Sequence, residues 1–319
     1  MSVDGVRYVH NRKIDTQLQS LLTSATSTSW RPVPPVVSDT PKDGSSTTFE
    51  ESKVIIHKRP SKQGEIFRLV YDIPIEDFSL NAWKAVLTTP EMRQEWDPGV
   101  ESSQLIELFD VDVRITKTYF TLGWPANPRD AITISRTISD GSTLLDVATS
   151  LPRSPDEPPY LRPTPPYVRS QVHLFAWVIQ QVPGPSGPKI RLTYFWQHDL
   201  KAVWSMGMPS RAHHLVSLMI GAVKTVTKFG NSIPMLQGFG LGVGMERMIF
   251  DIGRRSLAID YSIVHEQESD LDHKTPRGMD ELRAKKERRR LERSLELLLP
   301  KQSSWDVQMI TRAPSASLQ

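Results

Sequence analysis

The sequence contains no cysteine among its 319 residues. Disulfides, cysteine-based zinc sites and thiol catalysis are therefore excluded, and a cysteine-free chain suits a reducing compartment. No stretch approaches the ~18 consecutive apolar residues that cross a bilayer, and the opening MSVDGVRYVH lacks the apolar core of a signal peptide. We expect a cytoplasmic protein whose contact with membranes, where it has any, is peripheral.

Sequence motifs for covalent or metal catalysis are also missing. The chain has no G-x-S-x-G elbow and no H-E-x-x-H pair, so His198–Asp199 and His213–His214 lack catalytic partners and are interpreted as structural. GFGLGVG (238–244) does not match G-x-G-x-x-G and follows no predicted strand, which favours a flexible exit segment. We expect no enzyme, no metal and no cofactor; a cyclase or hydrolase assembled from scattered residues is the least favoured alternative.

Positive charge is concentrated in one segment. Residues 283–293, RAKKERRRLER, carry +7 − 2 = +5, and the rest of the chain therefore carries +3 − 5 = −2. The fold itself is not basic, so we expect no specific nucleic-acid binding. The tail at 280–299 is a good helix former with Leu291, Leu295 and Leu298 on one side. It is either a solvated helix or a site for an anionic membrane, nuclear targeting or a partner protein.

The hydrophobic periodicity predicts long strands and few helices, which is typical of an α+β fold. The expected elements are a helix at 16–22, strands at 53–58 and 65–73, a helix at 75–89, hairpins at 104–110/114–122 and 130–138/143–151, a Pro-rich connection at 152–166, strands at 167–182 and 189–200, and an amphipathic helix at 209–233. A curved antiparallel sheet can wrap around the last helix and leave an apolar hollow. We divide the chain into 1–49 (helix and linker), 50–236 (main domain) and 237–319 (connector and basic tail).

Six stretches, in order, are similar to the START lipid-transfer family of the helix-grip superfamily. They are AWKAVL (82–87), EWDPGVESSQLIE (95–107), DVRITKT (112–118), GWPANPRDAITISR (123–136), PPYVRSQVHLFAW (165–177) and LTYFWQHDLKAVW (192–204). The Pro-rich insert and the Asp199-Leu200-Lys201 segment resemble a fungal START-like subfamily. The resemblance implies a curved antiparallel sheet around a long C-terminal helix, with an internal apolar cavity.

The stretch EWDP (95–98) has two interpretations, an acid–base pair of an enzyme or a corner between helix and sheet. The resemblance favours the corner, with Trp96 as apolar filling and Pro98 stopping the preceding helix. Asp97 then accepts hydrogen bonds from nearby backbone amides.

Strand alternation selects candidate ligand contacts, because side chains two positions apart share a face. If Thr118 faces inward, so do its alternate neighbours on that strand. Sterol-type members of the family carry an acid and an arginine at the positions of Thr118 and Ser135, and the two hydroxyls here put a buried ion pair and a sterol assignment in doubt. The expected contacts are Arg114, Thr116, Thr118, Phe120, Thr133, Ser135, Trp177, Tyr194, Trp196, Met219 and Val223.

The resemblance also implies a gate over the cavity, formed by the loop 121–128 and the last helix. Its candidate residues are Leu122, Trp124 and Arg129. Trp124 either dips into a membrane interface or packs on the helix, and Arg129–Asp130 forms a structural pair at the mouth or contacts a headgroup.

The sequence therefore predicts a protein that binds a single lipid-like ligand (a sterol, a phospholipid or another apolar small molecule) and transfers or senses it at membranes. The alternative is a lipid-sensing scaffold whose basic tail recruits a partner.

Overall fold

The computed structural model describes most of the chain. The described residues are 16, 29–34, 51–74, 79–122, 126–151, 153, 157–185, 187–201, 211–263, 283, 287, 290–301 and 305–310. The helix expected at 16–22 lies outside them except for its first residue, and Trp124 lies outside them as well.

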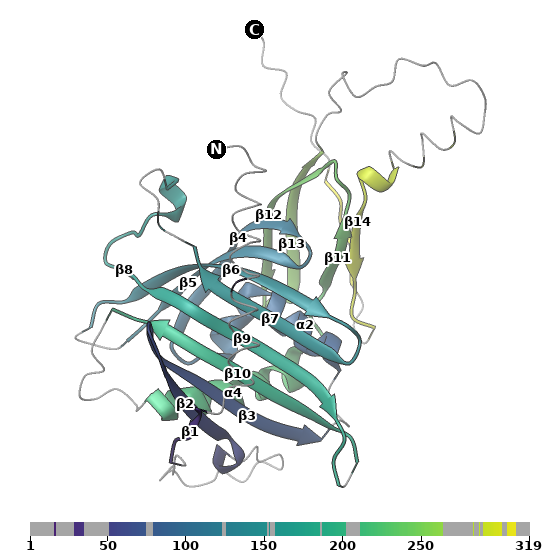
Figure 1. Ribbon diagram of the computed structural model, residues 1–319. Coiled ribbons are helices and arrows are strands. Elements are labelled where there is room, and N and C mark those ends of the chain that lie inside the picture. The colour runs from purple at the N-terminus through teal and green to yellow at the C-terminus, as the bar shows by residue number, and fades with distance from the viewer. Residues whose placement is uncertain are drawn as a thin grey trace.

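A ten-stranded sheet forms the body of the fold (Figure 1). Its strands are β1 (Arg31–Pro32), β2 (Ile55–Ser61), β3 (Gly64–Pro74), β4 (Val100–Asp110), β5 (Val113–Phe120), β6 (Arg129–Ser139), β7 (Thr143–Ser150), β8 (Val168–Arg169), β9 (Gln171–Val182) and β10 (Lys189–Asp199). They are ordered β1-β2-β3-β10-β9-β7-β6-β5-β4, and β8 pairs in parallel with β6. All other neighbours are antiparallel, so the predicted hairpins and the α+β class are confirmed.

A short helix and a corner lead from β3 into β4. Helix α2 (Leu80–Thr88) starts at Ser79, whose hydroxyl accepts a hydrogen bond from the Ala82 amide at 3.0 Å. The turns η3 (Pro90–Met92) and α3 (Arg93–Trp96) follow. Asp97 accepts from the Gly99 amide at 3.1 Å, and Trp96 is buried in the main core. The stretch EWDP is therefore a structural corner.

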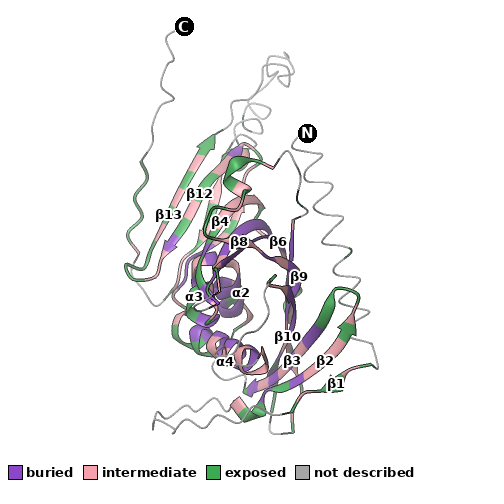
Figure 2. Ribbon diagram, turned by 90° about the vertical axis from the view of Figure 1, so that its left-hand side faces the viewer, coloured by how far each residue is buried: buried purple, intermediate pink, exposed green. Residues whose placement is uncertain are grey.

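Helix α4 (Arg211–Phe229) lies against the concave side of the sheet together with α2 and α3 (Figure 2). It ends at Phe229, before the predicted end at 233, and its apolar stripe, which includes Leu215 and Met219, is fully buried in the core. Gly221 has a specific packing role, because a Cβ there would lie 2.4 Å from the Trp96 carbonyl oxygen. The backbone of α4 thus contacts the corner directly.

The outer face of the sheet also carries apolar clusters. Val113, Ile115, Ile132 and Ile134 form one, against which Leu161 of the Pro-rich connection packs. A second cluster on β7, β9 and β10 packs against Trp30, whose ring lies 6.1 Å from that of Phe195 and under the guanidinium of Arg68. Several strands are therefore buried on both faces.

Two further strand pairs lie beside the main sheet. They are β11 (Met235–Phe239) with β14 (Leu295–Leu298), and β12 (Val243–Asp251) with β13 (Ser256–Ile263). The interpretation of GFGLGVG as a flexible exit segment is therefore wrong. Its glycines admit a neighbouring backbone, since a Cβ at Gly240 would lie 2.2 Å from the Glu292 carbonyl carbon.

The tail is only partly helical where it is described. Arg290 to Glu292 are helical, but Leu295 and Leu298 belong to strand β14. The prediction that one helical face carries Leu291, Leu295 and Leu298 is therefore wrong. Pairing of β14 with β11 overrides the local helix propensity at 295–298.

Candidate ligand-binding site

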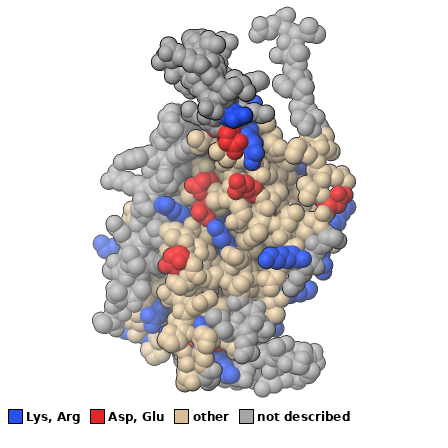
Figure 3. Space-filling model, turned by 90° about the vertical axis from the view of Figure 1, so that its right-hand side faces the viewer, with Lys and Arg blue, Asp and Glu red and all other residues tan. Residues whose placement is uncertain are grey.

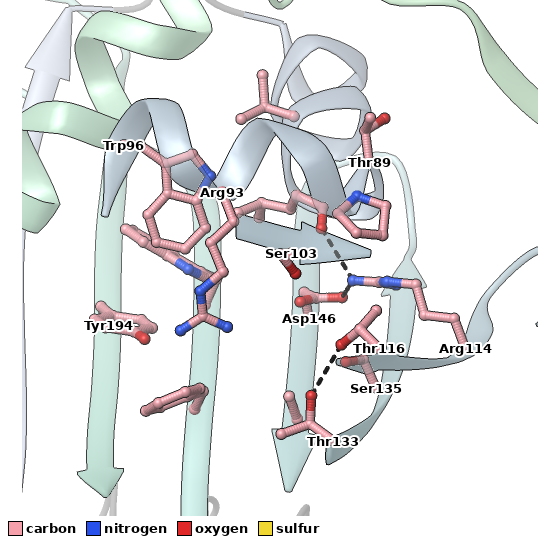
Figure 4. Close-up of a pocket in the computed structure, with 16 residues that line it drawn as sticks. Thr89, Arg93, Trp96, Ser103, Arg114, Thr116, Thr133, Ser135, Asp146 and Tyr194 are labelled. Carbon is pink, nitrogen blue, oxygen red and sulfur yellow. Dashed lines mark hydrogen bonds and ion pairs between the residues drawn. The ribbon is translucent and has the colours of Figure 1, made fainter. Parts of the chain in front are cut away.

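A cavity of about 40 Å³ lies between the concave face of the sheet and the segment from α2 to α3 (Figure 4). Six of the predicted contacts border it: Arg114, Thr116, Thr133, Ser135, Trp177 and Tyr194. Five others are buried without bordering it in the part of the chain that the structure describes: Thr118, Phe120, Trp196, Met219 and Val223. The predicted inward face of β5 and β6 is thus where the cavity lies.

Hydroxyl groups line the side of the cavity formed by β4, β5 and β6. The Oγ1 atoms of Thr116 and Thr133 lie 3.0 Å apart on paired strands. Ser103 Oγ and Thr118 Oγ1 lie 2.9 Å apart in the same way. Each hydroxyl has one partner and retains further hydrogen-bonding capacity, because a hydroxyl both donates and accepts.

A buried ion pair also borders the cavity, at positions other than Thr118 and Ser135, where the sequence had put one in doubt. Arg114 Nη2 lies 2.8 Å from Asp146 Oδ1 and 3.0 Å from the carbonyl oxygen of Leu87, to which it donates. Thr137 donates to the same carboxylate at 2.7 Å. The pair uses a residue on β7 that strand-by-strand reasoning did not consider. It joins the sheet to the end of α2.

Arg93 supplies the other cation of the site, and no sequence argument selected it. Its Nη2 donates to Asp97 Oδ2 at 3.3 Å, while its buried Nε has no hydrogen-bond partner within the described residues. The guanidinium lies 4.8 Å from the ring centre of Phe175 and 5.5 Å from that of Phe120. Figure 4 shows it extending into the space between Tyr194 and the hydroxyl-bearing strands.

Aromatic rings form the opposite wall. The rings of Trp177 and Tyr194 stack with centres 4.3 Å apart, and Trp96 meets Trp177 edge to face at 5.8 Å. Burial raises the pKa of the Tyr194 phenol, so this side chain is neutral. The cavity therefore combines an aromatic wall, a hydroxyl wall and two arginines, of which Arg93 was not among the expected contacts.

The predicted gate residues have structural contacts. Leu122 is buried. Arg129 donates to the carbonyl oxygens of Leu200 at 2.6 Å and Lys201 at 3.1 Å, and burial lowers its pKa. Asp130 binds Arg169 with both carboxylate oxygens, each at 2.9 Å, so Arg129 and Asp130 each make structural contacts with other partners.

His198 is a buried neutral residue. Its pKa lies well below the usual value because of burial, with a further contribution from Arg93. Ser170 Oγ donates to the Asp130 carbonyl oxygen at 2.9 Å, so His198 Nε2, also 2.9 Å from Ser170 Oγ, carries the proton. The imidazole has a structural role, as the sequence indicated. No group of three or more His, Asp or Glu side chains is placed to hold a metal among the described residues.

The cavity is too small for a lipid in this conformation. About 40 Å³ accommodates roughly two or three water molecules, whereas pockets for drug-sized ligands span ~300–1,000 Å³. The prediction of a hollow large enough for a guest is therefore not met here, because Arg93, Trp96 and Trp177 fill the space between sheet and helices. None of the described helices has the length and apolarity needed to cross a bilayer.

Comparison with known proteins agrees with this architecture. Among solved structures, the human StAR-related lipid transfer protein 5 superposes with a TM-score of 0.51 at 18% identity, covering 70% of this chain and 99% of its own. Human STARD10 gives a TM-score of 0.46 at 18% identity, covering 67% and 78%. No curated protein sequence matches the chain significantly. The model of the START domain matches residues 19–229, more than half of the chain. The chain belongs to the START domain family.

Proposed function

We propose that this protein binds one amphipathic lipid in an expanded form of the cavity and carries it between membranes in the cytoplasm. The lipid-transfer activity named for a structural neighbour supports a lipid as the ligand class. The mixed lining supports a ligand with a polar headgroup, because hydroxyls and a cation in a closed cavity need polar partners.

Arg93 is the observation on which the proposal depends. A buried guanidinium whose Nε has no hydrogen-bond partner has lost hydrogen bonds to water on folding. It gains hydrogen bonds again when an oxygen-rich group binds. Its existing contact, Asp97, is at 3.3 Å, which is long for a charge-assisted hydrogen bond. We propose that acceptor oxygens of a phosphate or carboxylate headgroup contact Arg93, with Thr116 and Thr133 contacting neighbouring polar atoms.

The apolar part of the ligand provides the driving force for binding. Burying a CH₂ group is worth ~0.8 kcal/mol, so a chain of ~16 carbons gains roughly 12 kcal/mol when it is shielded from water. Desorption through water is correspondingly slow, and an apolar cavity that opens at a membrane surface removes most of that barrier. The basic segment 283–293, with its net +5 charge, attracts the protein to anionic membranes at ~1 kcal/mol per basic residue near the surface.

Lipid extraction from vesicles tests the proposal. Purified protein is incubated with mixed-lipid vesicles, re-isolated and analysed by native mass spectrometry for a bound lipid. We expect one lipid per chain and a loss of about tenfold or more in capture by Arg93→Met, while Arg93→Lys retains part of it. Arg191→Met is the matched control, because Arg191 pairs with Asp72 on the exposed surface.

Three results decide the outcome. Protein that extracts no lipid contradicts the proposal. A folded Arg93→Met variant with unchanged capture contradicts the headgroup assignment. Binding without transfer to acceptor vesicles contradicts the carrier role and supports the alternative, a lipid sensor whose tail serves as an adaptor.

A further inference from the structure

Two arginines and a histidine gather on the outer face of strands β2 and β3. Arg68 lies between Phe67 and Leu69, whose side chains belong to the main core, so strand alternation directs Arg68 to the opposite face. His57 pairs with Arg68 across the two strands and shares that face, and Arg59 lies two positions further along β2. The group is therefore on the other side of the sheet from the ligand cavity.

The ring of Trp30 lies against this group. The guanidinium carbon of Arg68 is 4.7 Å from the centre of the ring, and that of Arg59 is 5.5 Å from it. Trp30, His57 and both arginines are half-buried. A ring face attracts cations, but it does not accept the N–H groups that a guanidinium carries in its own plane. The indole thus holds two cations against one ring and neutralises neither.

The carboxylates of the surrounding strands are paired with other cations. The three acidic residues of β1, β2, β3 and β10 form ion pairs as follows: Glu65 with Lys58, Asp72 with Arg191, and Asp199 with Lys201. Figure 3 shows a similar mixture on the side of the molecule away from β1 and β2, where acidic and basic side chains are interspersed. Arg68 differs, because no carboxylate among the described residues pairs with it and its buried Nε has no hydrogen-bond partner there.

His57 adds a second buried nitrogen to the group. Burial lowers the pKa of His57, and the charge of Arg68 lowers it further, so the imidazole is neutral at neutral pH. Its buried Nδ1 has no hydrogen-bond partner within the part of the chain that the structure describes. Burial also lowers the pKa of Arg68. Positive charge and unused hydrogen-bonding atoms therefore meet at one place on the sheet.

We propose that Arg68, Arg59 and His57 bind a phosphate group on the outer face of β2 and β3. Guanidinium groups bind phosphate oxygens through paired N–H bonds, and a tetrahedral anion presents oxygens to several donors at once. A carboxylate has only two oxygens, which a single guanidinium occupies. The phosphate belongs either to a free ion or to the headgroup of a lipid at a membrane surface. This inference goes beyond the proposed function, whose site lies on the other face of the sheet.

The pKa of His57 provides a readout at the site itself. Full-length protein is titrated with acid and base and followed by NMR in phosphate, acetate or chloride of equal ionic strength, with the His57 signal assigned through His57→Gln. We expect phosphate alone to raise the pKa of His57 by about 1, because a bound anion favours the imidazolium. No rise with phosphate, or an equal rise with acetate or chloride, overturns the proposal.

Substitutions of Arg68 measure its contribution to phosphate binding. The phosphate concentration that gives half of the His57 response should increase about tenfold or more in Arg68→Met. Arg68→Lys keeps the charge without the planar fork and should retain part of the affinity; it supplies the same comparison if Arg68→Met does not fold. Arg191→Met removes an equal charge from the same face of the sheet and should bind as wild type does. Equal phosphate binding by wild type and the Arg68 variants also overturns the site.

Co-sedimentation distinguishes a lipid headgroup from a free ion. Wild type and Arg68→Met are compared on phosphatidylcholine vesicles that contain phosphatidic acid or phosphatidylserine. Binding to phosphatidic acid that requires Arg68 and is reversed by inorganic phosphate assigns a headgroup, whereas a His57 response without such binding assigns the free ion; the absence of both refutes the site. Lipid capture by the cavity should be equal in wild type and Arg68→Met, so failure of the carrier proposal and failure of this one are told apart.

Discussion

Glu91 should make the stability of this protein fall as the pH rises through neutrality. It lies in η3, which contacts β12, and borders a cavity of about 30 Å³ with Phe250 and Leu257. Burial raises the pKa of this carboxyl from 4.5 to about 7, partly offset by hydrogen bonds from its own amide and from the Phe250 amide. The other charged group at this cavity among the described residues is Arg114, which pairs with Asp146.

The direction of the pH dependence follows from the raised pKa of Glu91. Because the pKa is higher in the folded state, the unfolded state binds fewer protons between about pH 4.5 and 7, and stability decreases over that range. The difference of 7 − 4.5, about 2.5, corresponds to roughly 3 kcal/mol at 1.36 kcal/mol per pH unit. The loss begins as pH rises above 4.5 and is complete above about pH 8.

Urea unfolding of wild type and Glu91→Gln from about pH 5 to pH 8 measures this term. Glutamine keeps an acceptor oxygen for the Phe250 amide and cannot ionise. We expect the unfolding free energy of wild type to fall over this range by roughly 2.5 kcal/mol relative to that of the variant. The exposed Glu95→Gln is the control and should follow wild type. Parallel curves for wild type and Glu91→Gln would refute the reasoning.

Three further substitutions test packing. Gly221→Ala places a Cβ 2.4 Å from the Trp96 carbonyl oxygen, so we expect a loss of about 1–3 kcal/mol in thermal or urea unfolding; an unchanged stability contradicts the close contact. Arg114→Met leaves Asp146 buried without its cation and should cost about 3–5 kcal/mol, whereas a loss under 1 kcal/mol means that the carboxylate is hydrated or protonated. Gly240→Val should detach the tail, seen as new cleavage within 283–293 on limited proteolysis with the melting temperature of the main domain retained; an unchanged cleavage pattern argues against the docked tail.

The hairpins were predictable because each is local in sequence. The turn after Asp110 and the one at Asp140–Gly141 are marked by residues that favour turns, and Asp140 accepts from the Ser142 and Thr143 amides. Which face of each strand points inward was harder to predict. The outer face is also apolar and covered, so β5 and β6 are buried almost continuously. Only the family resemblance indicated the inward face.

Arg93 and Asp146 could not be selected by strand alternation, because their roles arise from contacts between distant elements. Asp146 meets Arg114 across 32 positions of sequence. Arg93 carried one local signal, the i, i+4 spacing to Asp97, which places an arginine and an aspartate on one side of a helical turn. That spacing occurs on many exposed helices, and only the packing of Phe175 against the guanidinium distinguishes this pair.

The glycine pattern at 238–244 shows a different limit of prediction from local sequence. Alternating glycines weaken a strand considered alone, and for that reason a flexible segment was predicted. Residues 292–296 approach this segment closely, and a larger side chain at Gly240 would collide with their backbone. The glycines therefore permit strand pairing here. The partner strand lies more than 50 positions away along the chain, beyond any local pattern.

The two small cavities indicate how the site can enlarge. Thr89 and Arg114 border both of them, so the end of α2 and η3 forms the wall between the two cavities. Enlargement through the sheet would break ladder hydrogen bonds, and displacement of α4 would break its contact at Gly221. Displacement of the wall at 88–91 breaks instead the hydrogen bond from the Phe250 amide to the Glu91 carboxylate and disturbs the one from Arg114 to the Leu87 carbonyl oxygen. Because Glu91 lies in this wall and burial raises its pKa, ionisation of Glu91 destabilises the packing between the wall and β12.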